Sequence, residues 1–191
     1  MSASAGPRYV GDVDALKALA HPLRQRMLTR LQSRGPATSA ILAVEFDIDR
    51  GAASYHLRQL ERFGFVEQDD AMSSGRRRFW RSVPADTRLP LSGEAAAGDE
   101  VQVIRRLWRD QADRELAAFR ADEAAHGEFA DAAMSSQGRS TLTAAELAAF
   151  AEEYIALLRR WRREPHEASP GARPVTVLFY AFPTPDQVGL G

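Results

Sequence analysis

The sequence predicts a mainly helical fold with one β-hairpin, an α+β arrangement in which a small domain precedes a second helical region. Apolar residues recur at helical spacing in short segments between residues 13 and 63. Two strand-like runs then flank a Gly/Ser turn between residues 65 and 83, and a well-signalled amphipathic helix begins near residue 143. The length of 191 residues, 27% charged and 45% hydrophobic, fits one globular domain or one small domain with an appendage.

Start and stop signals set the bounds of the first four helices. The first covers residues 13–20, and the second starts at Pro22 and ends at Gly35. Thr38 or Ser39 caps the third helix, and a short linker leads to a fourth from about residue 51 to 63. His21, which precedes the helix-starting proline, is interpreted as a capping or core-edge residue.

The hairpin comes next, with strands expected at 65–69 and 76–83 around the turn at 70–75. Residues 100–126 predict a long helix, and the apolar run 175–182 is typical of a buried strand. A capping box, Thr143 with Glu146, opens the last helix. The predicted organisation is a helix-rich domain with a hairpin over 1–83, a linker over 84–98, and a helical region over 99–191.

Composition excludes several classes of function. Absence of cysteine excludes disulfide scaffolds, thiolate metal sites and cysteine catalysis. No phosphate-binding glycine loop, zinc-binding helix motif or catalytic-triad spacing occurs, so we predict no enzyme, no cofactor and no resident metal. The N-terminus lacks a signal-peptide core and no apolar run is membrane-length, which predicts a cytoplasmic protein with no membrane partner.

Charge is divided between the two halves of the chain. Residues 1–90 carry 14 basic and 10 acidic side chains, whereas residues 91–191 carry 11 basic and 16 acidic ones. The first half is therefore the one expected to face DNA or another anion.

The fourth helix separates into a buried stripe and a polar outer face. At 100° per residue, Ala53, Leu57 and Leu60 cluster on the buried side. The opposite side and its flanks hold Gly51, Ser54, Tyr55, Arg58, Gln59 and Arg62, with no carboxylate among them. Arginine can donate twice to guanine and glutamine can read adenine in a major groove. The alternative is a solvated helix face, and the arginine-rich hairpin beside it favours nucleic acid.

The second hairpin strand carries the basic residues Arg76, Arg77, Arg78 and Arg81. Because side chains alternate along a strand, at least one arginine-bearing face meets solvent or phosphate. Neutralisation of phosphates would supply affinity without sequence preference. The alternative is an arginine-rich edge strand that prevents aggregation.

Three motifs stand in a characteristic order: LKALAHPLR at 16–24, ASYHLRQL at 53–60 and FGFV at 63–66. Over about 12–83 the sequence resembles the ArsR-type winged helix-turn-helix transcriptional regulators. The resemblance implies a homodimer that binds double-stranded DNA, with contacts from Ser54, Tyr55, His56 and Arg58 and with Thr38 and Ser39 near phosphate. The chain departs from the metal-sensing members, because cysteine is absent and its four histidines are scattered.

These observations predict a dimeric repressor that occupies a palindromic operator, the choice of repressor over activator following the resemblance. The alternatives are a winged-helix module that binds proteins and an architectural DNA binder without an effector. The resemblance implies that segments outside the winged helix supply the dimer contacts, so we expect region 99–191 to be a helical dimerisation region. An unidentified small-molecule effector would also bind there. There Trp108, Phe119, Tyr154 and Trp161 would line a pocket if they converged, and plain core is the competing interpretation.

Overall fold

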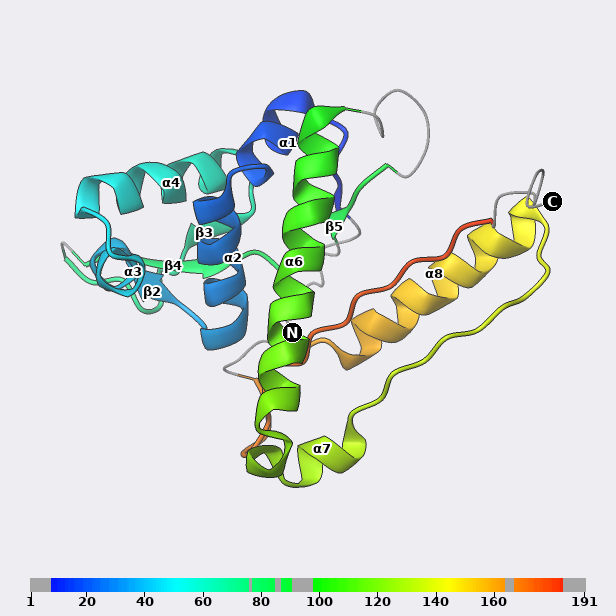
Figure 1. Ribbon diagram of the computed structural model, residues 1–191. Coiled ribbons are helices and arrows are strands. Elements are labelled where there is room, and N and C mark those ends of the chain that lie inside the picture. Colours follow the sequence, from blue (N-terminus) through cyan, green and yellow to red (C-terminus); the bar gives the residue numbers. More distant parts are fainter. Residues whose placement is uncertain (1–7, 76, 85–86, 91–97, 164–166, 184–191) are drawn as a thin grey trace. The chain divides into compact units, whose positions relative to one another are not determined.

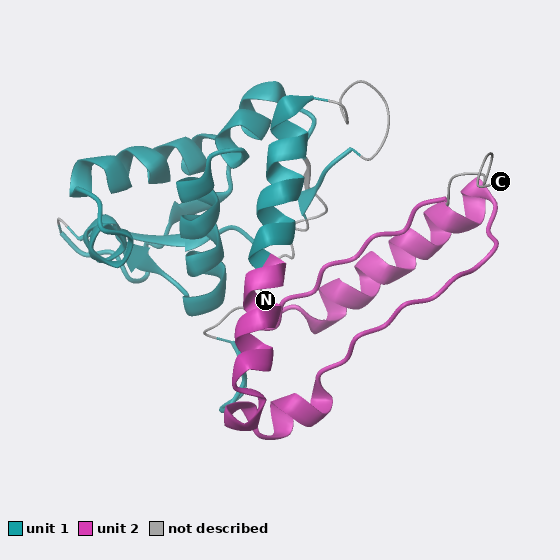
Figure 2. Ribbon diagram, in the orientation of Figure 1, with its two compact units in different colours: residues 1–111, 163–174 teal, residues 112–162, 175–191 magenta. Residues whose placement is uncertain are grey.

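The computed structural model describes residues 8–75, 77–84, 87–90, 98–163 and 167–183 (Figure 1). The chain forms two compact units (Figure 2). Unit 1 comprises Met1–Gln111 and Arg163–Pro174, and unit 2 comprises Ala112–Arg162 and Val175–Gly191.

Four helices open unit 1: α1 (Val13–Leu19), α2 (Pro22–Arg34), α3 (Ser39–Phe46) and α4 (Arg50–Arg62). Each helix is preceded by an N-cap residue whose side chain accepts a hydrogen bond from a backbone N–H of the first turn. These caps are Asp12, His21, Thr38 and Asp49. The predicted helices are confirmed to within one or two residues, and so is the capping role of His21.

The hairpin is confirmed, with shorter strands than expected. β3 (Val66–Gln68) and β4 (Phe79–Ser82) pair antiparallel, and a two-residue strand that was not predicted, β2 (Ala37–Thr38), pairs on the other side of β4. The parallel pair β1 (Arg8–Tyr9) and β5 (Thr87–Arg88) was also not predicted. Burial alternates along β4, so Trp80 and Ser82 face the core.

The core of unit 1 gathers apolar residues from the four helices and from the sheet, the largest fully buried ones including Leu19, Met27, Leu31, Leu42, Leu57 and Leu60. α6 (Asp99–Ala121) adds Val101 and Ile104 to the same core. The Trp108 indole N–H donates to Gln25 Oε1 at 3.2 Å and ties α6 to α2. Unit 1 therefore runs on to Gln111, past the boundary expected at residue 98.

Unit 2 contains the end of α6, a 3₁₀ turn (Glu123–His126), α7 (Glu128–Ala132) and α8 (Ala144–Trp161). The capping box at the start of α8 is confirmed, since Thr143 and Glu146 bond reciprocally. The helix expected over 100–126 ends at Ala121. The prediction of a buried strand at 175–182 is wrong, because these residues have no ladder partner among the described residues and are largely exposed.

The predicted fold class, mainly helical with a β-hairpin, is confirmed. Within the described part of the chain, no helix combines the length and the apolar character that crossing a membrane requires.

Candidate nucleic-acid interface

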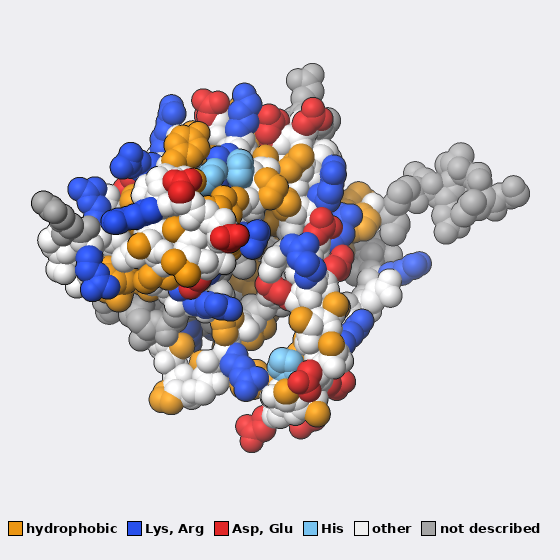
Figure 3. Space-filling view, turned by 60° about the vertical axis from the view of Figure 1, so that its left-hand side comes forward, with side chains coloured by type: hydrophobic (Ala, Val, Ile, Leu, Met, Phe, Trp, Pro, Cys, Tyr) orange, Lys and Arg blue, Asp and Glu red, His pale blue; other side chains and the backbone are white. Residues whose placement is uncertain are grey.

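The outer face of α4 is open to solvent, as the sequence predicts. Gly51, Tyr55, Arg58 and Arg62 are exposed, while the buried stripe consists of Ala53, Leu57 and Leu60. The flanking residues Ser54 and Gln59 are half-buried. Lys and Arg side chains spread over this side of unit 1 (Figure 3). The helix thus presents aromatic, guanidinium and amide groups together.

The N-terminus of α4 is held by Asp49, whose Oδ1 accepts from the Ala52 N–H at 2.8 Å. A Cβ at Gly51 would lie 2.9 Å from that same oxygen, so any larger residue there would have to displace the capping carboxylate. The turn before it places Asp47 in the left-handed region at φ 52°, a conformation that Asp tolerates better than most residues. The α3–α4 turn is therefore set by its own side chains.

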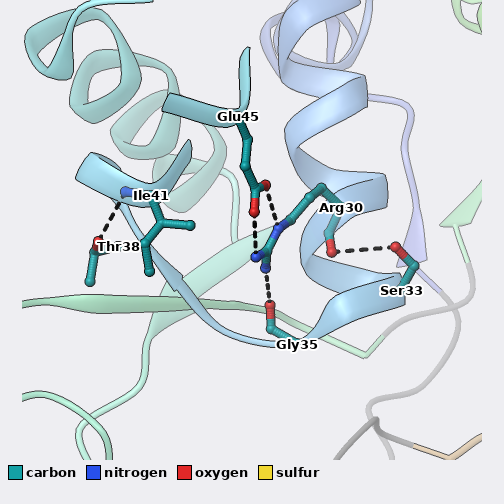
Figure 4. A network of polar contacts seen from close by, with 6 residues as sticks. All are labelled: Arg30, Ser33, Gly35, Thr38, Ile41 and Glu45. Atoms are coloured by element: carbon teal, nitrogen blue, oxygen red, sulfur yellow. Dashed lines mark hydrogen bonds and ion pairs between the residues drawn. The ribbon is translucent and has the colours of Figure 1, made fainter. Parts of the chain in front are cut away.

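An ion pair fixes α3 against α2 (Figure 4). Arg30 donates from Nε to Glu45 Oε2 at 2.7 Å and from Nη2 to Glu45 Oε1 at 2.9 Å. Its Nη1 also donates to the Gly35 carbonyl at 2.8 Å, which closes the α2 C-terminus. The guanidinium lowers the pKa of Glu45 below its ordinary value. Sequence reasoning missed this pair, because no local pattern links residues fifteen apart.

His56 lies on the inner flank of α4. Its ring is half-buried, 4.7 Å from the His21 ring and 5.3 Å from the Tyr55 ring between centroids. His21 Nδ1 accepts from the Leu23 N–H at 3.2 Å, so this nitrogen carries no proton. Burial lowers the pKa of both histidines, and the nearby Arg24 lowers them further. The two imidazoles join α4 to the start of α2, and a DNA contact from His56 stays a prediction.

The wing, which is the hairpin formed by β3 and β4, places two arginines in solvent. Arg77 and Arg78 are exposed, and the Arg77 guanidinium lies 5.8 Å from the Phe79 ring. Arg81, by contrast, pairs with Glu67 of β3 at 2.6 Å. Arg76, predicted as a further contact, lies outside the described residues. Contacts of Arg77 and Arg78 with phosphate stay a prediction, with which their exposure is compatible.

Thr38 and Ser39 stand at the start of α3. Thr38 Oγ1 accepts from the Ile41 N–H at 3.2 Å and is half-buried, whereas Ser39 is only 9% exposed. Thr38 caps the helix, and its hydroxyl proton remains available for a phosphate oxygen. Burial makes Ser39 the weaker of these two predicted contacts.

Of the four aromatic residues predicted to line an effector pocket, three have separate partners and the fourth is exposed. Trp108 belongs to unit 1 and bonds Gln25. In unit 2, Phe119 packs on His126, Tyr154 stacks on Phe179 at 3.8 Å, and Trp161 is exposed. The pocket stays a prediction. No cluster of three or more His, Asp or Glu suited to a metal ion occurs among the described residues.

Comparisons with known proteins agree with this fold. A family model described as a helix-turn-helix domain matches residues 19–69, from the end of α1 through β3. This segment is therefore similar to helix-turn-helix domains. Together with the wing formed by β3 and β4, the match confirms the winged helix-turn-helix expected from the sequence.

Several solved structures are similar to the chain. One is the homodimeric winged helix-turn-helix DNA-binding domain of a possible ArsR-family transcriptional regulator from Mycobacterium bovis. It is 24% identical to this chain, and the match covers 53% of this chain and 76% of that chain, with a TM-score of 0.35. A possible transcriptional regulator for arsenical resistance is 29% identical to this chain. The match covers 56% of this chain and 97% of that protein's chain, with a TM-score of 0.34. Lactococcus lactis ZitR in complex with DNA is 14% identical to this chain. The match covers 74% of this chain and 75% of ZitR, with a TM-score of 0.33. No curated protein matches the chain.

Proposed function

We propose that the chain is a homodimeric, sequence-specific DNA-binding repressor. The observation that carries this proposal is the outer face of α4, where Tyr55, Arg58 and Arg62 are exposed, next to a wing that exposes Arg77 and Arg78. The neighbouring carboxylate of Glu61 lies off this face and accepts from Gln68 Nε2. The helix-turn-helix match on residues 19–69 supports it.

The two arginine groups have different tasks in this proposal. α4 enters a major groove, where Arg58 donates to guanine O6 and N7 and Gln59 reads a neighbouring base. Arg77 and Arg78 neutralise phosphates beside the groove and carry no sequence information. Two copies read the two halves of a palindromic operator, and occupancy of the operator blocks transcription.

Single substitutions separate these tasks. Arg58→Ala should weaken binding to the operator about 5- to 150-fold and relax specificity at one base pair, because a bidentate contact is worth about 1–3 kcal/mol. Arg77→Ala should weaken binding to all sequences alike and reduce the salt slope by about one, because one phosphate contact is lost. Fluorescence anisotropy over a salt series measures both.

A matched control removes the same charge elsewhere in unit 1. Arg106→Ala, at an exposed position on α6, should leave operator affinity within about twofold. Equal losses on all sequences from Arg58→Ala and Arg77→Ala would refute the division into reader and wing. Unchanged affinity in both variants would favour a protein-interaction module.

A further inference from the structure

One arginine of α8 is buried at the atoms that would bind a partner. The half-buried positions of α8 form one stripe along the helix, namely Leu147, Ala151, Tyr154, Ile155, Leu158 and Arg159. Arg159 is the charged member of this stripe. Its Nε and Nη2 are shielded from solvent, and neither has a hydrogen-bond partner among the described residues. Buried guanidinium donors without an acceptor are costly, so their retention here requires an explanation.

The two buried atoms form one edge of the Arg159 guanidinium. The N–H groups on this edge are parallel, and their spacing matches the two oxygens of a carboxylate. Arg30 in unit 1 uses the same edge for Glu45, with Nε and Nη2 donating at 2.7 and 2.9 Å. The Arg159 edge is therefore suited to an oxyanion that presents two oxygens side by side.

The described part of the chain offers no carboxylate to this edge. On α8, the residues three and four positions before Arg159 are Ala156 and Ile155, and neither side chain can accept a hydrogen bond. Glu115 of α6 accepts from Thr176 Oγ1 instead. An arginine in the last turn of a helix also interacts with the helix dipole, but this interaction does not require buried donors. These observations favour an oxyanion from a separate molecule.

The surroundings of Arg159 suit an anion that carries an apolar group. Arg162 lies three residues on, at the C-cap of α8, and is also half-buried, so a second positive charge favours an anion over a cation. The rest of the stripe is apolar or aromatic. The segment 175–182 runs beside it, with Phe179 stacked on Tyr154 at 3.8 Å (Figure 1). Ligand sites typically combine such an apolar lining with a few polar groups that fix the orientation of the ligand.

We propose that Arg159 belongs to a binding site in unit 2 for a small organic anion, a carboxylate attached to an apolar body. Nε and Nη2 donate to the two carboxylate oxygens, and the stripe of α8 contacts the apolar body. A phosphate group offers the same pair of oxygens, and the second test below distinguishes the two. The site goes beyond the proposed function. It stands on unit 2 alone and is tested without DNA, so a failure of operator binding leaves it unaffected.

The first test needs no ligand. Arg159→Met keeps an unbranched apolar stem and removes the buried donors, whereas Arg160→Met removes the same charge from an exposed position in the same turn. Hydrogen exchange of the α8 amides, followed by mass spectrometry of the full chain, reports the stability of this helix. Exchange should be slower in Arg159→Met than in the wild type, because the unpartnered donors are gone, and it should not be slower in Arg160→Met. Faster exchange in Arg159→Met than in Arg160→Met would make Arg159 a structural residue and overturn the proposal.

The second test adds sodium benzoate, sodium acetate or inorganic phosphate at constant ionic strength and follows the same α8 amides. Benzoate should slow exchange in the wild type at lower concentration than acetate, because its ring contacts the apolar stripe. Arg159→Met should raise the half-saturating benzoate concentration more than about 10-fold, and Arg160→Met should respond as the wild type does. A stronger effect of phosphate than of benzoate would overturn the carboxylate and assign the site to a phosphate. An effect of none of the three anions, or an equal effect in Arg159→Met, would overturn the site itself.

Discussion

Replacing Glu45 by alanine is expected to destabilise unit 1 by about 2 kcal/mol, because it leaves the Arg30 guanidinium without its carboxylate. Two charge-assisted hydrogen bonds of 2.7 and 2.9 Å are lost, while the bond to the Gly35 carbonyl remains. The Arg30 side chain is 15% exposed and that of Glu45 30%. Water therefore replaces part of the interaction, so the cost lies between that of a surface pair, about 0–1 kcal/mol, and that of a broken buried pair, about 3–5 kcal/mol.

A double-mutant cycle isolates the pair from other consequences of each change. Urea unfolding of Glu45→Ala, Arg30→Ala and the double variant should give a coupling free energy of about 1 kcal/mol or more. Gln32→Ala, at an exposed position on α2, should change stability by less than about 0.5 kcal/mol. A coupling energy near zero would show that the bidentate pair does not hold α3 against α2.

Two further predictions concern unit 1. Burial and Arg24 hold the pKa values of His21 and His56 below 6.5 in the folded state. The unfolded chain therefore binds more protons at acidic pH than the folded chain does. The free energy of unfolding should be at its full value above pH 6.5 and should fall as the pH drops through the folded pKa values. Urea unfolding at pH 7.5 and 5.5 measures this loss of stability. A double variant, His21→Asn with His56→Gln, keeps a capping side chain at position 21 and should lose less stability between the two pH values. An unchanged pH dependence in this variant would assign the loss to other groups. Leu57→Ala empties a fully buried position and should cost about 2–5 kcal/mol, whereas a cost below about 1 kcal/mol would contradict the tight packing beneath α4.

Local patterns were sufficient to predict the first four helices and the hairpin of unit 1. The 3.6-residue period of α4 places Ala53, Leu57 and Leu60 on one side of the helix and leaves the arginines on the other, and the structure buries these three residues. The start of the helix shifted to Arg50 because Asp49, in the preceding linker, supplies the cap. Contacts between residues far apart in the sequence could not be predicted from local patterns. Neither the Arg30–Glu45 pair nor the two-residue strand β2 has a local sequence signal.

The C-terminal part was harder to predict because burial there depends on a partner. An apolar run such as 175–182 indicates that a segment needs covering, but a strand also requires a ladder, and the described residues offer none. Unit 1 also extends past the boundary expected at residue 98. Val101 and Ile104 belong to the core of unit 1 although they lie on a helix that extends beyond it.

Selection of genomic DNA fragments by the purified protein at about 150 mM salt, followed by sequencing, tests the central claim most directly. Weak phosphate binding is largely suppressed at this ionic strength, whereas specific sites persist. We expect recovery of a two-fold symmetric motif whose half-sites are about 10–11 base pairs apart or a multiple of that, and Arg58→Ala should blur one position in each half-site. Recovery of no motif by a folded dimer would contradict the assignment of α4 as a reader of DNA sequence.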